Sequence, residues 1–304
     1  MSQNVSRTWR GVRRTWRGFV QVGRFVRRKR SRLLYTGVLA LVAIVGVLGP
    51  ALAPYPAGAY HYDASGQLLV AEGPSLSHPL GTTATGRDVL SRLIVGAQPT
   101  AITGFLGGAI LITIGSSVGV TAGYLGGRAD SALMRFTDII YGIPLIPFAI
   151  VMVAFFGVGF IQTIAIIGLI LWRGSARVLR SQVLQIKERE FILAVQSEGA
   201  SAFYIIRRHI LPNILPMIAF FFAVGLGGTI IIQAGLSFIG VTDPFVPTWG
   251  VMIRNAYDSG YLDAWWWSLP PGLLISAVVY SAIMLGRSIE TAEEAGESEG
   301  LAQM

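Results

Sequence analysis

Residues 188–213 read EREFILAVQSEGASAFYIIRRHILPN and interrupt an otherwise strongly apolar sequence. The stretch is charged, has Gly199 near its middle and ends in Leu-Pro-Asn. We expect two short helices, 188–196 and 202–210, that meet at Gly199, because glycine adopts a positive φ at no steric cost. A polar helix–turn–helix between two membrane spans must lie in water, where another protein can bind it. The alternative, a plain connecting loop, would need neither two helices nor a fixed corner.

The composition is that of an integral membrane protein. Of the 304 residues 53% are hydrophobic and 13% are charged, whereas a soluble domain has about 25% charged residues. There is no cysteine, which excludes disulfides, thiolate metal sites and a cysteine nucleophile. Neither of the two lysines follows a glycine, so a phosphate-binding loop of the G-x-x-x-x-G-K-[ST] type is absent. We expect no catalytic residue and no cofactor in this chain, and any ATP and Mg²⁺ to be bound by another subunit.

Uncharged runs of residues predict an all-α polytopic membrane protein with six transmembrane helices. The runs are 33–53, 93–127, 139–172, 214–242 and 264–286. The third run has 34 residues, and a turn at 156–159 would divide it into two spans. Four prolines are expected to mark kinks or helix starts in the third and fifth spans: Pro144, Pro147, Pro212 and Pro216.

The positions of the basic residues predict the orientation. With six spans and both termini on the same side, 21 of the 24 basic residues lie on that side, and only Arg87, Arg92 and Arg254 lie on the other. The side rich in basic residues is expected to be the cytoplasm of a cell (plasma or inner) membrane. A basic segment, 1–32, and an acidic tail, 291–304, then flank a membrane domain, 33–290. An outer loop, 54–92, and a cytoplasmic loop, 188–213, project from that domain.

The eleven basic residues before position 33 directly precede an apolar run, which favours contact with anionic lipid over nucleic acid. This basic region is too long for a cleaved signal peptide. In the outer loop, residues 88–94 predict a short amphipathic helix, with Arg87 and Arg92 solvated at the interface. His61, His78 and His209 are scattered and show no spacing typical of a metal site.

Three further features allow a structural and a functional interpretation. A stripe of glycines in the second span permits close helix packing, which is either static or a surface that slides during transport (Gly115, Gly119, Gly123 and Gly127). Asp138 is expected to form a structural ion pair with Arg135, Arg173 or Arg177 rather than to transfer protons. The three tryptophans at 265–267 predict an aromatic belt at the membrane surface, with a sugar-stacking platform as the alternative.

Several motifs make the chain similar to a known family. Leu193-Ala194-Val195, Gly199 and Leu211-Pro212-Asn213 resemble, in register, the EAA loop of permease subunits in binding-protein-dependent ABC importers, although the Glu and one Ala of that motif are missing. Other segments resemble the dipeptide, oligopeptide and nickel branch of the family: 78–82, 86–92, 123–127, 133–138, 237–240 and 247–250. The usual Gly-Thr-Asp and Gly-Asp-Gly are replaced by Gly81-Thr82-Thr83 and Gly286-Arg287-Ser288.

The resemblance implies a type I ABC importer permease fold and a heteromeric complex. A second homologous permease would complete the pathway, two ATP-binding subunits would dock on the cytoplasmic loops, and an extracytoplasmic solute-binding protein would deliver the solute. The residues expected to couple this chain to the ATPase are Ala194, Gln196, Glu198, Gly199, Ala200 and Ser201. Peptides are the substrate that the resemblance implies, with oligosaccharides as the alternative. A stand-alone secondary carrier is a competing class, but no inverted repeat or ion site at the middle of the membrane supports it.

Overall fold

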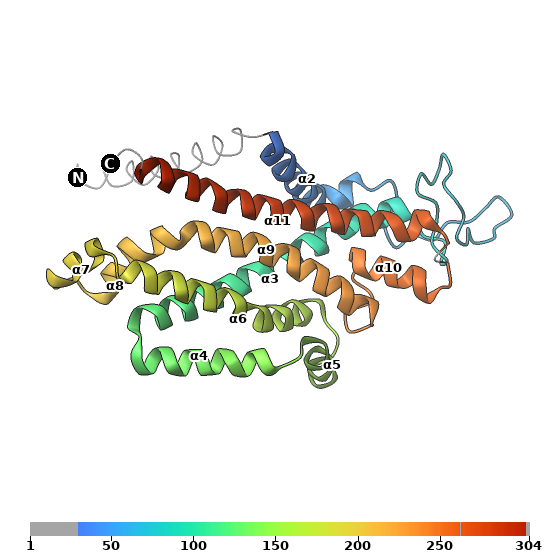
Figure 1. Ribbon diagram of the computed structural model, residues 1–304. Helices are drawn as coiled ribbons and strands as arrows, with labels where there is room; N and C mark the ends of the chain where they lie inside the picture. Colours follow the sequence, from blue (N-terminus) through green and yellow to red (C-terminus); the bar gives the residue numbers. More distant parts are fainter. Residues whose placement is uncertain (1–29, 262, 302–304) are drawn as a thin grey trace, which may run out of the picture.

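A computed structural model describes residues 30–261 and 263–301 and shows an elongated helical bundle (Figure 1). These residues contain no β-strand, only two isolated antiparallel bridges, Tyr62 with Leu68 and Thr82 with Asp88. The long helices are α2 (Arg30–Leu52), α3 (Val89–Leu125), α6 (Phe160–Lys187), α9 (Leu211–Phe238) and α11 (Trp265–Leu301). The shorter helices are α4 (Gly127–Gly142), α5 (Leu145–Phe156), α7 (Glu190–Ser197), α8 (Ala202–Ile205) and α10 (Trp249–Asp258).

Helix α3 is the centre of the bundle and packs against α6, α9 and α2. Its glycines permit the close approach to α6. A Cβ atom added at Gly119 would lie 2.5 Å from the backbone oxygen of Ala176, so only glycine fits there without a shift. Gly115 and Gly123 face α6 in the same way, which confirms a packing stripe on this helix. Gly127 does not extend the stripe, because α3 ends at Leu125 and Gly127 opens α4.

Within the described part of the chain, five helices are long and apolar enough to cross a membrane, and a sixth crossing results if α4 and α5 form one broken span. The turn expected at 156–159 is present between α5 and α6. The third span is broken into two helices that meet at 86°, which agrees with the kink or helix start expected at Pro144. The break lies at Pro144, because the residue before a proline is disfavoured in helical conformation and Ile143 is extended (φ −85°, ψ 114°).

The helix boundaries differ from the sequence-based ones at two further places. No separate helix covers 88–94; α3 begins at Val89, with the Asp88 side chain accepting a hydrogen bond from the Ser91 backbone N–H at 2.7 Å. The fifth span begins well before the expected position 214, since α8 continues through a π-helical turn, Ile206–Ile210, into α9. Pro212 follows this π-helical turn as the second residue of α9, where the hydrogen-bond pattern of the continuous helix changes.

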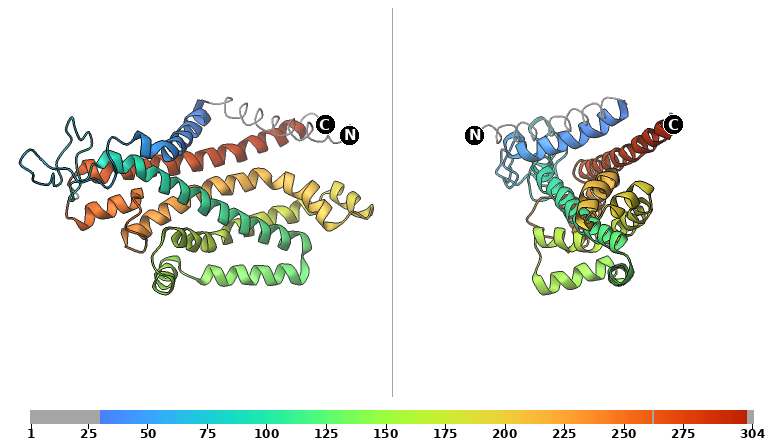
Figure 2. Two further views of the ribbon diagram at one scale, coloured as in Figure 1. Left: turned by 180° about the vertical axis from the view of Figure 1, so that it is seen from behind. Right: turned by 90° about the vertical axis from the view of Figure 1, so that its left-hand side faces the viewer.

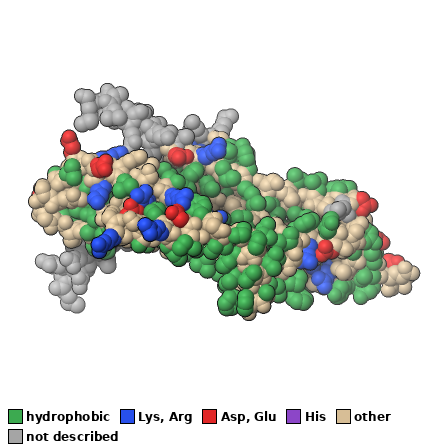
Figure 3. All heavy atoms as spheres, turned by 60° about the horizontal axis from the view of Figure 1, so that its bottom comes forward, with side chains coloured by type: hydrophobic (Ala, Val, Ile, Leu, Met, Phe, Trp, Pro, Cys, Tyr) green, Lys and Arg blue, Asp and Glu red, His purple; other side chains and the backbone are tan. Residues whose placement is uncertain are grey.

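The bundle has two unlike ends. Helices α7 and α8 lie at one end, and the outer loop and α10 lie at the other (Figures 1 and 2). In Figure 3, charged side chains gather toward both ends, and hydrophobic side chains cover much of the surface between them. The segments predicted to lie on opposite sides of the membrane are therefore at opposite ends of the molecule. The predicted basic segment lies almost entirely outside the described residues, as do the side chains of the acidic tail.

Candidate functional site

The corner between α7 and α8 is fixed by a helix-terminating hydrogen-bond pattern. The backbone N–H of Gly199 donates to the oxygen of Gln196 at 3.0 Å, and that of Ala200 donates to the oxygen of Val195 at 3.4 Å. These are the two bonds of a Schellman motif, whose central residue needs a positive φ, and Gly199 has φ +80°. The Ser201 hydroxyl then accepts a hydrogen bond from the Tyr204 backbone N–H at 3.3 Å and caps α8. The expected elbow is confirmed, with α7 shifted by one or two residues.

Each helix of the elbow has a buried and an exposed face. Ile192 and Ile205 are fully buried, together with Ile210 in the π-helical turn, and all three belong to the core cluster shared with α3 and α6. On the outer face Leu193 is 52% exposed and Phe203 is 71% exposed. Exposed apolar side chains beside polar ones are typical of a protein–protein contact surface. We call the surface formed by Phe191, Leu193, Phe203 and Tyr204 the elbow surface.

The elbow surface was not identified from the sequence, because its side chains looked like ordinary apolar residues of short helices. The expected coupling residues lie around it. Ala194, Glu198, Gly199 and Ser201 are exposed, whereas Gln196 is half-buried. Ala200 is also half-buried and packs against the core cluster, so it supports the corner from inside. The corner thus presents four of the six expected residues to a partner.

Basic side chains of α6 connect the elbow to the neighbouring helices. Arg180 binds Asp130 of α4 through two bonds of 2.5 and 2.6 Å. Lys187, the last residue of α6, donates to the backbone oxygen of Tyr124 at 2.7 Å. Arg173 donates to the oxygen of Ile140 at 2.6 Å, near the end of α4. These contacts join α6, whose last residue directly precedes the elbow, to α3 and α4.

Asp138 forms an ion pair with Arg177, one of the three partners expected for it. Both side chains are about half exposed, so the contact contributes little to stability. This arrangement agrees with a structural ion pair. The bidentate bond between Arg180 and Asp130 is better shielded, and it was missed because its partners are 50 residues apart in the sequence.

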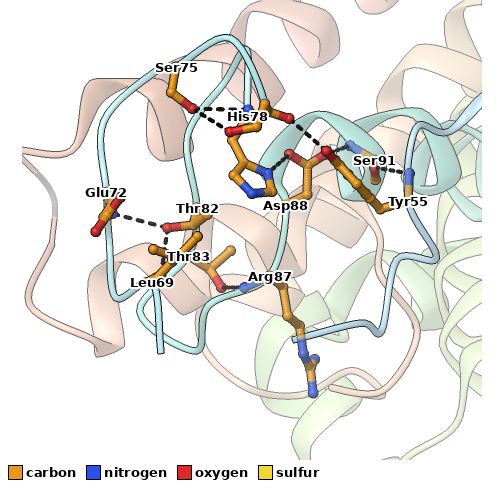
Figure 4. Close-up of polar contacts among 11 residues, drawn as sticks. Tyr55, Leu69, Glu72, Ser75, His78, Thr82, Thr83, Arg87, Asp88 and Ser91 are labelled. Atoms are coloured by element: carbon orange, nitrogen blue, oxygen red, sulfur yellow. Dashed lines mark hydrogen bonds and ion pairs between the residues drawn. The ribbon is translucent and has the colours of Figure 1, made fainter. Parts of the chain in front are cut away.

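The outer loop folds around a buried polar cluster (Figure 4). His78 Nδ1 lies 2.8 Å from Asp88 Oδ1, and both residues are buried. Asp88 also caps α3, so a single carboxylate joins the loop to the start of the helix. The rings of Tyr55 and His61 pack against each other and against His78. Burial lowers the pKa of His61, and the neighbouring His78 lowers it further, while Asp88 acts in the opposite direction.

The two arginines of this region differ from the expectation. Arg87 points away from the cluster (Figure 4), is half-buried and donates to the Tyr60 hydroxyl at 2.8 Å. Arg92 was expected to be solvated, but only 7% of its surface is exposed. It closes the first turn of α3 rather than lying in a separate surface helix, and it lines a cavity together with residues of the outer loop.

Aromatic residues at the outer end serve mainly to pack the bundle. Trp267 is buried and Trp265 is exposed, while the rings of Trp265 and Trp266 are nearly perpendicular at 81°. They form no common face on which a sugar could stack. Trp249 is buried at the start of α10, a helix that the sequence analysis did not identify, and its Nε1 donates to the oxygen of Leu93 at 2.9 Å. Within 30–261 and 263–301 no group of three or more His, Cys, Asp or Glu residues could hold a metal ion.

Comparison with known proteins identifies the family of this helical bundle. Residues 115–291, which include the elbow, match the model of the binding-protein-dependent transport system inner membrane component. The chain belongs to this family. Among its relatives, the dipeptide transport system permease protein DppC of Bacillus subtilis is 33% identical over 270 residues, which cover 88% of this permease and 82% of the relative. The glutathione transport system permease protein GsiD of Pectobacterium atrosepticum is 33% identical over 271 residues, 88% of each chain.

A solved structure supports the fold assignment. The inward-facing MetNI methionine ABC transporter has a chain that covers 66% of this permease and 95% of its own length, with a TM-score of 0.55 and 21% identity. The resemblance to ABC importer permeases of the dipeptide and oligopeptide branch, and the type I permease fold that it implied, are confirmed. The permease is therefore a multi-pass inner-membrane component of an ABC importer.

Proposed function

We propose that this permease forms half of the translocation pathway of a peptide importer and receives force from an ATPase through the elbow at 188–213. The single observation that carries the proposal is the elbow surface, an exposed apolar face held rigidly by the three buried isoleucines. Relatives named as dipeptide, oligopeptide and glutathione permeases support a peptide substrate. The chain itself would bind no ATP, and both of its termini would be cytoplasmic.

In this proposal a second homologous permease completes the pathway, two ATP-binding subunits supply the motion, and an external binding protein delivers the peptide. An ATPase subunit would bind the elbow surface together with Ala194, Gln196, Glu198, Gly199 and Ser201, with Ala200 supporting the corner. The buried isoleucines and the bonds of Lys187 and Arg180 would pass its motion to α3 and α4. The lipid bilayer would cover the apolar sides of the bundle.

Substitution of Gly199 tests the proposal. A Cβ atom at this position would meet nothing within 4 Å, so Gly199→Val disturbs the corner only through its backbone. A β-branched residue is strongly disfavoured at φ +80°, at a cost of about 1–3 kcal/mol. We expect the complex to assemble and hydrolyse ATP while peptide uptake falls at least about tenfold. Gly199→Asn is the matched control, because asparagine tolerates positive φ, and it should retain most uptake.

Two outcomes would contradict the importer mechanism, and a third would replace only its substrate. Normal uptake by the Gly199→Val importer would remove the elbow from the coupling mechanism. Purification of the permease without ATPase chains or a second permease would favour a stand-alone carrier instead. Uptake of oligosaccharides but not peptides by the intact complex would retain the importer and replace its substrate.

A further inference from the structure

A small polar cavity of about 230 Å³ lies at the outer end of the bundle. Its walls come from the outer loop, the beginning of α3, the C-terminal end of α10 and the beginning of α11. The polar groups that matter here are Thr85, Arg87, Arg92, Asn255, Asp258 and Ser259. None of them belongs to the elbow, so nothing in the coupling mechanism accounts for this cavity.

Arg92 has no partner for its charge among the described residues. Its guanidinium group forms no hydrogen bond or ion pair with any of them, although only 7% of the residue is exposed. Beside it, the Nε of Arg87 is buried and also lacks a hydrogen-bond partner in the described part of the chain. A buried cation without a counter-ion is costly, and buried charges in proteins are normally paired, so these two arginines are suited to bind an anion.

The charges of the cavity fit a monovalent anion. Two guanidinium groups and one carboxylate, that of Asp258, line the walls. Asp258 is already bound by Arg254, which lies 2.9 Å away and one helical turn earlier in α10. The three charged side chains of the lining sum to +1, and Asp258 shares its charge with Arg254, so the two arginines of the cavity can still bind one carboxylate. Guanidinium groups bind carboxylates through paired hydrogen bonds, and Thr85, Ser259 and Asn255 supply further donors.

The size and position of the cavity indicate where the carboxylate comes from. Its volume fits one side chain, whereas pockets that enclose whole small molecules are usually about 300–1,000 Å³. Thr85 and Arg87 precede α3, so the cavity lies at the loop end of the span rather than along its apolar length. A peptide in transit and a lipid phosphate are both less well matched to these walls than an acidic side chain presented from outside.

We propose that this cavity receives an Asp or Glu side chain of the external solute-binding protein when that protein docks on the permease. The proposal rests on the importer function proposed above and on the dependence on a binding protein that defines the family. The carboxylate would neutralise Arg92 and Arg87 only in the docked state. Docking would thereby be favoured in one orientation, and the binding protein would be released when the outer end changes shape.

The test uses the whole importer, with its ATPase chains, in lipid nanodiscs and the purified binding protein loaded with peptide. We expect Arg92→Gln to weaken docking, measured as Kd by surface plasmon resonance, by about 10- to 100-fold. Arg87→Gln should weaken docking in the same direction and to a smaller extent, because Arg87 is only half-buried. The weakening of docking caused by these substitutions should be smaller at high salt. Arg128→Gln, an equal charge change on the exposed start of α4 at the other end of the bundle, should leave Kd unchanged.

Each result has a defined meaning. If Arg92→Gln fails to assemble, Arg87→Gln decides, and a Kd equal to that of the parent overturns the proposal. A variant whose Kd for the binding protein is unchanged could instead lose uptake of peptides with a free C-terminus but keep uptake of amidated peptides. That result would show that the cavity binds the carboxylate of the substrate, and it would also overturn the proposal. A complex that lacks ATPase chains would refute the importer function itself. The two failures are therefore distinguishable.

Discussion

The contact between α3 and α6 at Gly119 gives the sharpest prediction. In Gly119→Ala the new Cβ would lie 2.5 Å from the Ala176 oxygen and 3.1 Å from the Arg180 nitrogen. Both are backbone atoms, so no side chain can turn aside. To reach an ordinary contact distance the two helices must separate by roughly 1 Å, which also loosens the neighbouring contacts of Gly115 and Gly123.

The expected cost follows from two opposing effects. Forcing an extra methyl group into a packed interface costs about 1–3 kcal/mol. Alanine in place of glycine regains up to about 1 kcal/mol of helix propensity. We therefore expect Gly119→Ala to lower the free energy of unfolding by up to about 2 kcal/mol, measured for the purified permease by titration from mild detergent into SDS.

A matched variant separates these effects. Gly235→Ala places a methyl group in α9 where nothing lies within 4 Å, so it should leave stability unchanged or raise it by up to about 1 kcal/mol. Equal unfolding free energies for the two variants would refute the close-packing argument. If the interface also slides during transport, uptake by Gly119→Ala should fall further than its reduced stability explains. Uptake that follows stability alone would leave the glycines as static packing.

Three other predictions concern the ion pair between α4 and α6, the elbow surface and the outer loop. Asp130→Asn should cost about 1–2 kcal/mol of stability, and a double-mutant cycle with Arg180→Gln should show the pair to be coupled; additive effects would contradict the bidentate bond. Replacing Leu193 and Phe203 together by Ser should reduce severalfold the amount of ATPase that co-purifies with the permease, while the thermal midpoint of the permease changes little. Co-purification of the ATPase at the parent level would contradict the role of the elbow surface as its binding site. Because burial lowers the pKa of His61, the unfolded loop binds protons more readily than the folded one. The stability of the outer loop should therefore be fully present above about pH 6.5 and fall as the pH drops through the lowered value. Hydrogen exchange of 54–88, corrected for intrinsic rates, should show this loss, and His61→Gln should abolish it.

The sequence by itself determined the class of the protein and the position of the elbow. Uncharged runs about as long as a bilayer is thick predict membrane helices, since any other chain conformation would leave backbone groups without hydrogen bonds in lipid. A charged stretch with a glycine at its corner predicted the elbow. The corner needs a residue with a positive φ, which is a local property of the chain that does not depend on the neighbouring helices. The motif resemblance added the family, and the comparisons confirmed it.

Only the tertiary structure decided what depends on contacts between distant residues. Pro144 predicted a kink or a helix start in the third span, but the 86° angle between the two halves depends on how α4 and α5 pack against α6. Arg180 binds Asp130 where two separate helices pack together, and Arg92 is buried where a loop packs on a helix. The spacing of residues along the sequence does not predict contacts between such distant segments. The elbow surface is of the same kind, because whether Leu193 and Phe203 face the core or the water depends on how the corner docks on the bundle.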